Sequence, residues 1–123
     1  MEAVYTKNAP EAIGPYSQAY KAGGFVFTSG QIAINPATGN VEASGIEAQT
    51  EQVIKNLAAV LSAAGSGLDK VVKTVCFLAD MADFAAFNAV YGKYFTAKPA
   101  RSCVAAKALP KNVLLEIEAV AEL

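Results

Sequence analysis

The run of residues 113–121 constrains the fold most, because its two sets of alternate positions differ in chemistry. One set is entirely apolar: Val113, Leu115, Ile117, Ala119 and Ala121. The other set consists of Leu114, Glu116, Glu118 and Val120. Side chains alternate between the two faces of a strand, so this run predicts a strand with one face in the core. Its second face is either solvated at a sheet edge or covered by another subunit.

Other runs predict the remaining strands. Gly23 and Gly24 separate two strand-like runs, and a Gly-Gly pair supplies the positive φ angles that a hairpin turn needs. Residues 71–78 are strand-like and apolar on both faces, so both faces of that strand must be covered. The full set of expected strands is 4–6, 17–22, 25–28, 71–78, 102–106 and 113–121, with a weak continuation at 32–34.

Two helices are expected between these strands. The first begins at a capping box, with Ser44 as the N-cap and Glu47 reaching back to it, and it ends at Gly65. Its apolar face recurs at helical spacing: Ile46, Thr50, Val53, Ile54, Leu57, Leu61 and Ala64. The second helix is capped by Asp80 and ends before Pro99. Its aromatic residues are spaced three and four positions apart: Phe84, Phe87, Tyr91 and Tyr94.

The order of the elements indicates an α+β fold. A hairpin, a helix, a strand, a helix and two strands predict one sheet with both helices packed on one face, in a single domain of residues 1–123. Hydrophobic residues make up 54% of the chain and charged residues only 17%, which is more apolar than an ordinary soluble domain. A small globule cannot bury so much apolar surface alone, so we expect a homo-oligomer.

Charge and composition argue against several classes of function. Ten basic and eleven acidic residues give a net charge of −1 with no basic stripe, which argues against a nucleic-acid partner. The start lacks the pattern of a signal peptide, and no apolar run is long enough to span a membrane. The cysteines, Cys76 and Cys103, fit no disulfide framework or metal-ligand spacing, and there is no histidine. We expect a cytoplasmic protein that uses no metal or cofactor.

Five residues are candidates for a functional site. The guanidinium of Arg101 suits bidentate binding of a carboxylate, with a surface ion pair as the alternative. Cys103 is a nucleophile or an inert core thiol, and no histidine is present to activate it. Ser29 and Gly30 end a strand, where they either offer backbone donors to an anion or form a bend. Tyr16 presents a hydroxyl or packs.

At these residues the sequence resembles the reactive intermediate deaminase family, RidA/YjgF, which has also been described as L-PSP endoribonucleases and translation inhibitors. The resemblance rests on segments spread in order over the whole chain: 8–10, 13–19, 28–32, 72–74, 83–84, 87–88, 99–104, 109–110 and 116–119. One departure is the approach to Pro99, where only two residues follow Phe95-Thr96, fewer than in some members. That loop is near the expected site, so it bears on which substrate side chain is preferred.

The resemblance implies a chorismate-mutase-like fold assembled as a homotrimer, with three equivalent clefts between subunits. It implies hydrolysis of 2-imino acids, in equilibrium with their enamines, to 2-oxo acids and ammonia, without a cofactor. The implied substrates are 2-iminobutanoate and 2-iminopropanoate, which arise when pyridoxal-phosphate enzymes dehydrate threonine or serine.

The resemblance also implies residue roles. Arg101 binds the substrate carboxylate, and backbone groups of Gly30 and Cys103 hold the ligand. Glu116 faces the reacting carbon or its water, with a pKa raised by burial and lowered by Arg101. The residues that line the cleft are Tyr16, Ser29 and Asn88.

Three other functions stay open on the sequence alone. The same arginine would serve a non-catalytic protein that binds or senses small carboxylates. RNA cleavage, implied by the older family description, finds little support in a chain without histidine or a basic face. A chaperone-like role after oxidation is reported for some relatives, and nothing in the sequence tests it.

Overall fold

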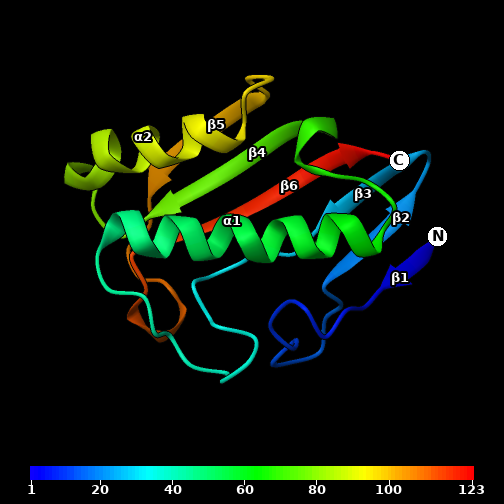
Figure 1. The fold of residues 1–123 in the computed structure, drawn as a ribbon, viewed down its shortest axis with the longest axis horizontal. Helices are drawn as coiled ribbons and strands as arrows, with labels where there is room; N and C mark the ends of the chain where they lie inside the picture. The colour runs from blue at the N-terminus through cyan, green and yellow to red at the C-terminus, as the bar shows by residue number, and fades with distance from the viewer.

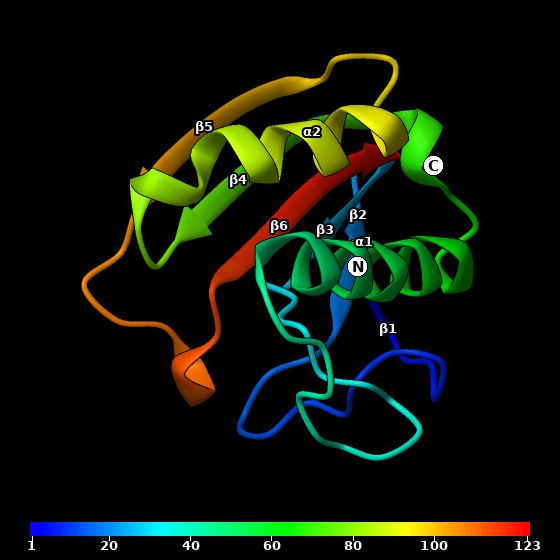
Figure 2. The ribbon, with the colours of Figure 1, turned by 60° about the vertical axis from the view of Figure 1, so that its left-hand side comes forward.

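The computed structural model describes residues 1–123 and contains one six-stranded sheet with two helices across one face (Figure 1, Figure 2). The strands are β1 (Glu2–Val4), β2 (Ala19–Ala22), β3 (Phe25–Thr28), β4 (Val71–Leu78), β5 (Ala100–Ala105) and β6 (Leu115–Glu122). The helices are α1 (Ile46–Ala63) and α2 (Phe84–Tyr94). The expected α+β architecture, with both helices on one face of the sheet, is confirmed.

The strands follow the order β1-β2-β3-β6-β4-β5. Only β4 and β5 run parallel, and every other neighbouring pair is antiparallel. The last strand, β6, therefore lies in the middle of the sheet, between β3 and β4. The interpretation that Glu116 and Glu118 belong to a solvated edge strand is wrong, because β6 is bonded on both sides. The edges are β1 and β5.

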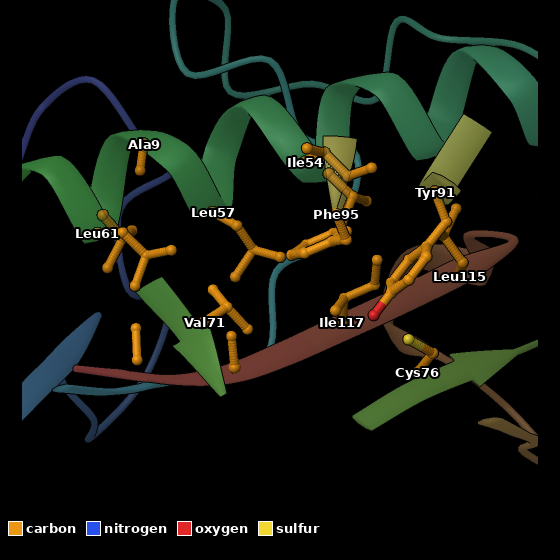
Figure 3. Close-up of a cluster of buried hydrophobic side chains, with 14 of the residues drawn as sticks. Ala9, Ile54, Leu57, Leu61, Val71, Cys76, Tyr91, Phe95, Leu115 and Ile117 are labelled. Atoms are coloured by element: carbon orange, nitrogen blue, oxygen red, sulfur yellow. The ribbon is translucent and has the colours of Figure 1, made fainter. Parts of the chain in front are cut away.

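The core lies between the helices and the facing side of the sheet (Figure 3). All the positions that the alternation of β6 assigned to the core are buried, and so are all seven residues on the expected apolar face of α1. Leu57 of α1 and Ile117 of β6 point toward one another in this layer, with Tyr91 of α2 and Phe95, which follows α2, beside them. Each fully buried leucine or isoleucine contributes about 1.5–3 kcal/mol, so this layer positions the helices on the sheet.

The hairpin β2–β3 forms as expected. Gly23 has φ 60° and Gly24 has φ 83°, the left-handed conformations that a two-residue hairpin turn requires and that glycine adopts most easily. Ala22 then pairs with Phe25 directly across the turn.

Both expected helix starts differ in detail from the structure. The capping box is wrong: the N-cap of α1 is Gly45, with φ 87° and no side-chain cap, and Glu47 is exposed. The chain enters the helix through a positive φ that glycine tolerates, so Ser44 lies one position too early to cap. Asp80 does cap, since its carboxylate accepts from the amide of Ala82 at 2.9 Å. It caps a short 3-10 turn that leads into α2 rather than the helix itself.

Two expected strands differ most, and three others shift by one or two residues: 17–22, 102–106 and 113–121 are observed as Ala19–Ala22, Ala100–Ala105 and Leu115–Glu122. The first strand is Glu2–Val4, not residues 4–6, because Val4 is the residue that packs into the core. Residues 32–34 form no strand, although Ile32 and Ile34 are buried. Their carbonyls accept hydrogen bonds from the Asn56 side chain of α1, at 3.0 and 2.9 Å, instead of from a neighbouring strand.

We call the sheet face opposite the helices the open face, because no element of the chain covers it (Figure 2). It carries aromatic and aliphatic side chains on five strands. Phe27 is 47% exposed and Val104 is 49% exposed, while Phe77 is only half-buried. Its apolar residues are Tyr20, Phe25, Phe27, Val75, Phe77, Val104 and Val120. Scattered exposed apolar residues are common, but a patch extending over several strands indicates a contact surface.

Neither helix of the structure combines the length and the hydropathy needed to cross a membrane.

Candidate functional site

Arg101 lies on the helix side of the sheet, beneath α2. It pairs with Thr74 of β4, whose side chain is fully buried. The Arg101 guanidinium carbon is 4.8 Å from the ring centre of Tyr91 and 5.5 Å from that of Phe84. Its Nη1 donates a hydrogen bond to Oδ1 of Asn88 at 2.8 Å. Aromatic faces attract a cation at these distances, so α2 holds the guanidinium in a fixed orientation.

The Arg101 side chain has no carboxylate partner. The only ion pair in the chain joins Lys21 to Glu2, far along the sheet at β1 and β2. The alternative that Arg101 makes a surface ion pair is therefore wrong. A half-buried arginine whose only side-chain partner is a neutral amide retains donors for an anion from outside the chain.

A cavity of about 480 Å³ opens beside this guanidinium. It lies between the end of α2 and the start of β5, and neither aspartate nor glutamate lines it. Its walls include Asn88, Tyr91, Phe95, Lys98, Pro99 and Arg101. The lining is mainly apolar, and the buried rings of Tyr91 and Phe95 stack behind it with centres 4.3 Å apart. An apolar wall with a fixed cation suits a small organic anion.

Both cysteines lie near Arg101 on the helix side of the sheet. Cys103 pairs with Cys76 across β4 and β5, and Tyr91 reaches toward Cys76 in Figure 3. Burial raises the pKa of Cys76 to about 12 and raises the pKa of Cys103 as well. Both groups are therefore thiols rather than thiolates at neutral pH, which supports the interpretation of Cys103 as an inert thiol.

Glu116 lies on the open face, on the opposite side of the sheet from Arg101. The chain after β3 continues alongside β6, where Gln31 and Ile117 exchange backbone hydrogen bonds of 2.8 and 3.1 Å. This pairing places Gly30 directly against the Glu116 side chain. A Cβ atom on Gly30 would lie 2.8 Å from Cδ and 3.0 Å from Cγ of Glu116, closer than real contacts allow. The absence of a side chain at Gly30 is what allows Glu116 its position.

The environment of Glu116 changes the pKa of its carboxyl group. Burial, and to a lesser extent the like charge of Glu118, raise the pKa of Glu116 above its ordinary value. Arg101 is not among the groups that affect it. The expectation that Arg101 lowers this pKa is therefore wrong for a single chain, because β4 separates the two side chains and they lie on opposite faces of the sheet.

A second, smaller hollow of about 80 Å³ lies in front of Glu116. Tyr16 and Gly30 line it, and Ser29 lies immediately before Gly30. The Ser29 hydroxyl donates to the carbonyl of Ser17 at 2.6 Å, so it holds the segment that carries Tyr16. The structure therefore groups Tyr16, Ser29 and Gly30 with Glu116.

The candidate residues thus divide into two half-sites. The Arg101 half-site contains Arg101, Asn88 and Cys103, beneath α2. The Glu116 half-site contains Glu116, Gly30, Ser29 and Tyr16, on the open face. The chain brings no three histidine, cysteine, aspartate or glutamate side chains together in an arrangement that would hold a metal ion.

Two residues near the half-sites were missed by sequence reasoning. Gln18 is buried and donates to the carbonyls of Thr6 and Pro10, both at 2.9 Å, which anchors the loop before Tyr16. Its strand-like surroundings give no signal of that role. Lys98 lines the cavity beside Arg101, and no local pattern marks it, because α2 and β5 come together only in the fold.

The chain matches the sequence model of the family described as Endoribonuclease L-PSP over residues 6–123. The chain belongs to the RidA/YjgF family. This member is 53% identical, over 98% of its length and 96% of the relative's, to a RutC family protein of Pyrococcus horikoshii. It is 50% identical to Reactive Intermediate Deaminase A, chloroplastic, of Arabidopsis thaliana, over 99% of this chain and 66% of that protein.

Solved structures agree with this membership. The crystal structure of Escherichia coli TdcF with bound serine superposes with a TM-score of 0.95 at 40% identity, over 100% of this chain and 99% of that one. Similarity at this level extends over the whole fold.

Proposed function

We propose that this RidA-family protein hydrolyses 2-imino acids, and the enamines in equilibrium with them, to 2-oxo acids and ammonia. The single observation that carries the proposal is Arg101: a half-buried guanidinium, framed by aromatic rings, with no carboxylate of its own chain. A relative at 50% identity that is named a reactive intermediate deaminase supports the reaction. The substrates proposed are 2-iminobutanoate and 2-iminopropanoate.

We also propose that the protein is a homotrimer and that each protomer is a single domain of residues 1–123. One chain cannot bring Arg101 and Glu116 together, because they lie on opposite faces of its sheet. The open face carries the apolar surface that a second copy would bury. In the proposed assembly the Arg101 half-site of one protomer meets the Glu116 half-site of the next, in three equivalent clefts. The number of copies comes from the family resemblance.

The proposed reaction needs neither a metal nor a strong nucleophile. An imine carbon is already electrophilic, so the remaining tasks are to orient the substrate and to move protons. Arg101 binds the carboxylate with its planar pair of donors and offsets its negative charge beside the reacting carbon. Water then adds to the C=N carbon, the C–N bond breaks, and ammonia leaves as the C=O bond forms.

Glu116 is the proposed proton carrier. It accepts a proton from the attacking water and returns one to the departing nitrogen. A carboxylate whose pKa is raised by burial is suited to both steps, because it accepts protons more readily than an exposed one. The same proposal assigns ligand-holding backbone groups to Gly30 and Cys103. It assigns the cleft lining to Tyr16, Ser29 and Asn88.

The experiment couples a threonine dehydratase to the purified protein and measures release of 2-oxobutanoate above the spontaneous rate. We expect the wild type to speed release and Arg101→Met to abolish the acceleration. Lys107→Met is the matched control, since it removes an exposed cation that follows β5 and takes part in neither half-site. Wild-type rates in the Arg101 variant, or an equal loss in the Lys107 variant, would contradict the role of Arg101.

A protein that binds small carboxylates without turning them over is the second candidate. The observation that favours it is that the Arg101 half-site is built within one chain and does not need Glu116. The relative TdcF holds serine, a small carboxylate, in its crystal structure. Thermal stabilisation by 2-oxobutanoate, together with no rate effect on any imine tested, would favour this candidate over the deaminase.

We place the protein in the cytoplasm in this proposal, because its two cysteines are free and buried or half-buried.

A further inference from the structure

Lys98 is the second cation of the cavity beside Arg101. It lies between the end of α2 and β5, and its ammonium makes no hydrogen bond or ion pair with any residue of the chain. No acidic side chain lines this cavity of about 480 Å³. Two unpaired cations in one cavity form a surface for a ligand with two negative groups.

The backbone at Lys98 is strained. Its φ is 53°, in the left-handed region that costs a lysine about 1–2 kcal/mol and favours glycine or asparagine. A following proline makes the position more unusual, since the residue before a proline prefers an extended conformation. The hydrogen bond from the Lys98 amide to the Phe95 carbonyl, at 3.1 Å, holds this turn closed.

A lysine in a conformation that it tolerates poorly, beside a cavity that already contains an arginine, is an outlier that points to function. The cavity lies over the stacked rings of Tyr91 and Phe95, which are themselves buried. Its lining is mainly apolar, which suits the methylene groups of a ligand, while a cation at each position holds one of its charged ends.

We propose that Lys98 and Arg101 together give dicarboxylic 2-imino acids, the imines of acidic amino acids, a binding advantage over 2-iminobutanoate and 2-iminopropanoate, which are substrates as well. Arg101 binds the carboxylate next to the imine carbon, the apolar lining of the cavity contacts the chain between the two ends, and Lys98 binds the distal carboxylate. This selection rests on the proposed function for its reaction, which is the same addition of water and loss of ammonia. The binding preference itself depends only on the cavity.

The stable 2-oxo acids serve as probes of binding, measured by isothermal titration calorimetry on the whole purified protein. We expect 2-oxoglutarate to bind about five-fold more tightly than 2-oxobutanoate, the size of effect that an exposed ion pair supplies. The preference should shrink as salt is raised, because exposed charges are screened. Lys98→Asn removes the charge and keeps a residue that tolerates a positive φ, so its unfolding temperature should not fall.

Lys98→Asn is expected to lose the preference and to bind the two oxo acids with equal affinity. Lys93→Gln is the control, because Lys93 is an exposed cation of α2 that does not line the cavity, and it should keep the preference. Equal affinities in the wild type, or a preference that survives in Lys98→Asn, would overturn the assignment of Lys98.

A second measurement separates this inference from the proposed function. An amino acid oxidase acting on glutamate or on 2-aminobutanoate generates the two imines in place, and the release of oxo acid is followed with and without the protein. Faster release with glutamate, lost in Lys98→Asn, supports both proposals. A binding preference without any acceleration would overturn the deaminase and leave the selection of dicarboxylates standing. Acceleration of both imines to the same extent would overturn the selection and leave the deaminase standing.

Discussion

The Arg101 and Glu116 half-sites are built by opposite means. Arg101 is held from several sides by α2, with three rings and the Asn88 amide around its guanidinium. Glu116 is held by close contact with a single backbone position, Gly30, on a face that no helix covers. Neither half-site contains a charge that neutralises its own. Each half-site therefore holds its own charged side chain in place but contains no opposite charge to pair with it.

The difference arises from the two faces of the sheet. On the helix side, packing of α2 restricts Arg101 to one orientation before any ligand arrives. On the open face no helix packs over Glu116, and the half-burial of its side chain by neighbouring residues raises its pKa. The comparison indicates that the Arg101 half-site should mainly determine binding and the Glu116 half-site should mainly determine rate.

Glu116→Gln should have the largest effect on the rate and should separate the two half-sites most clearly. The amide keeps the size of the side chain but cannot accept a proton from water, so kcat should fall by about 100- to 10,000-fold. The affinity for 2-oxobutanoate should change little, because the carboxylate is bound by the other half-site. Dehydratase-coupled rates and calorimetry measure the two quantities on the same sample. A large loss of affinity with a normal kcat would reverse the assignment of the half-sites.

Gly30→Ala should reproduce much of that loss of kcat, although it leaves the Glu116 carboxylate chemically unchanged. The new Cβ collides with the Glu116 side chain, and displacement of a catalytic group by about 1 Å lowers kcat by about 100-fold. Steady-state kinetics of a double-mutant cycle test the cause, since the same change in a Glu116→Gln background should cost little more. Independent, fully additive losses would show that Gly30 acts through something other than Glu116.

On the other half-site, Asn88→Ala should raise KM about five-fold and leave kcat nearly unchanged. It removes the hydrogen bond that orients the Arg101 guanidinium, an interaction of about 1 kcal/mol. Asn88→Asp should be worse, because the new carboxylate would pair with Arg101 and compete with the ligand for it. Inhibition by 2-oxobutanoate measures the affinity of each variant. Equal behaviour of the two variants would show that charge at this position does not matter.

The smallest expected effect is on the acid side of the pH–rate profile. Glu116 must be deprotonated to accept a proton, so the rate falls as the pH drops through its raised pKa. Glu118→Gln removes the like charge that contributes to the shift, so the acid limb of kcat should move to lower pH. Profiles of the two proteins in the same buffers give the comparison. A limb that moves to higher pH would show that Glu118 does not act on Glu116 through its charge.

Much of the fold was predictable from residues whose pattern is compatible with only one type of local structure. The alternation in β6 and the helical spacing in α1 both predicted side chains that are buried in the structure. Apolar residues that share one face of an element pack into the core. The glycine pair of the hairpin was equally direct. The start of α1 was not, since two adjacent residues, Ser44 and Gly45, both favour caps and only the path of the chain selects one.

For the site, sequence reasoning selected candidate residues but could not place them relative to one another. Arg101 and Glu116 are 15 positions apart in the chain, and their distribution over the two faces depends on the parallel pairing of β4 with β5 and the central position of β6. Strand order is a long-range property that no local pattern encodes. Lys98 went unrecognised for the same reason, because its cavity is assembled from α2 and β5.

The sequence by itself determined which residues form the core, where the hairpin turns and that the chain is more apolar than one small domain can hide. It also determined the family, through motifs distributed along the whole length. Only the tertiary structure decided that the arginine is unpaired, that Gly30 makes room for Glu116, and that the two half-sites face away from each other. Periodicity is set by the geometry of one element, whereas contacts between charges depend on how several elements pack together.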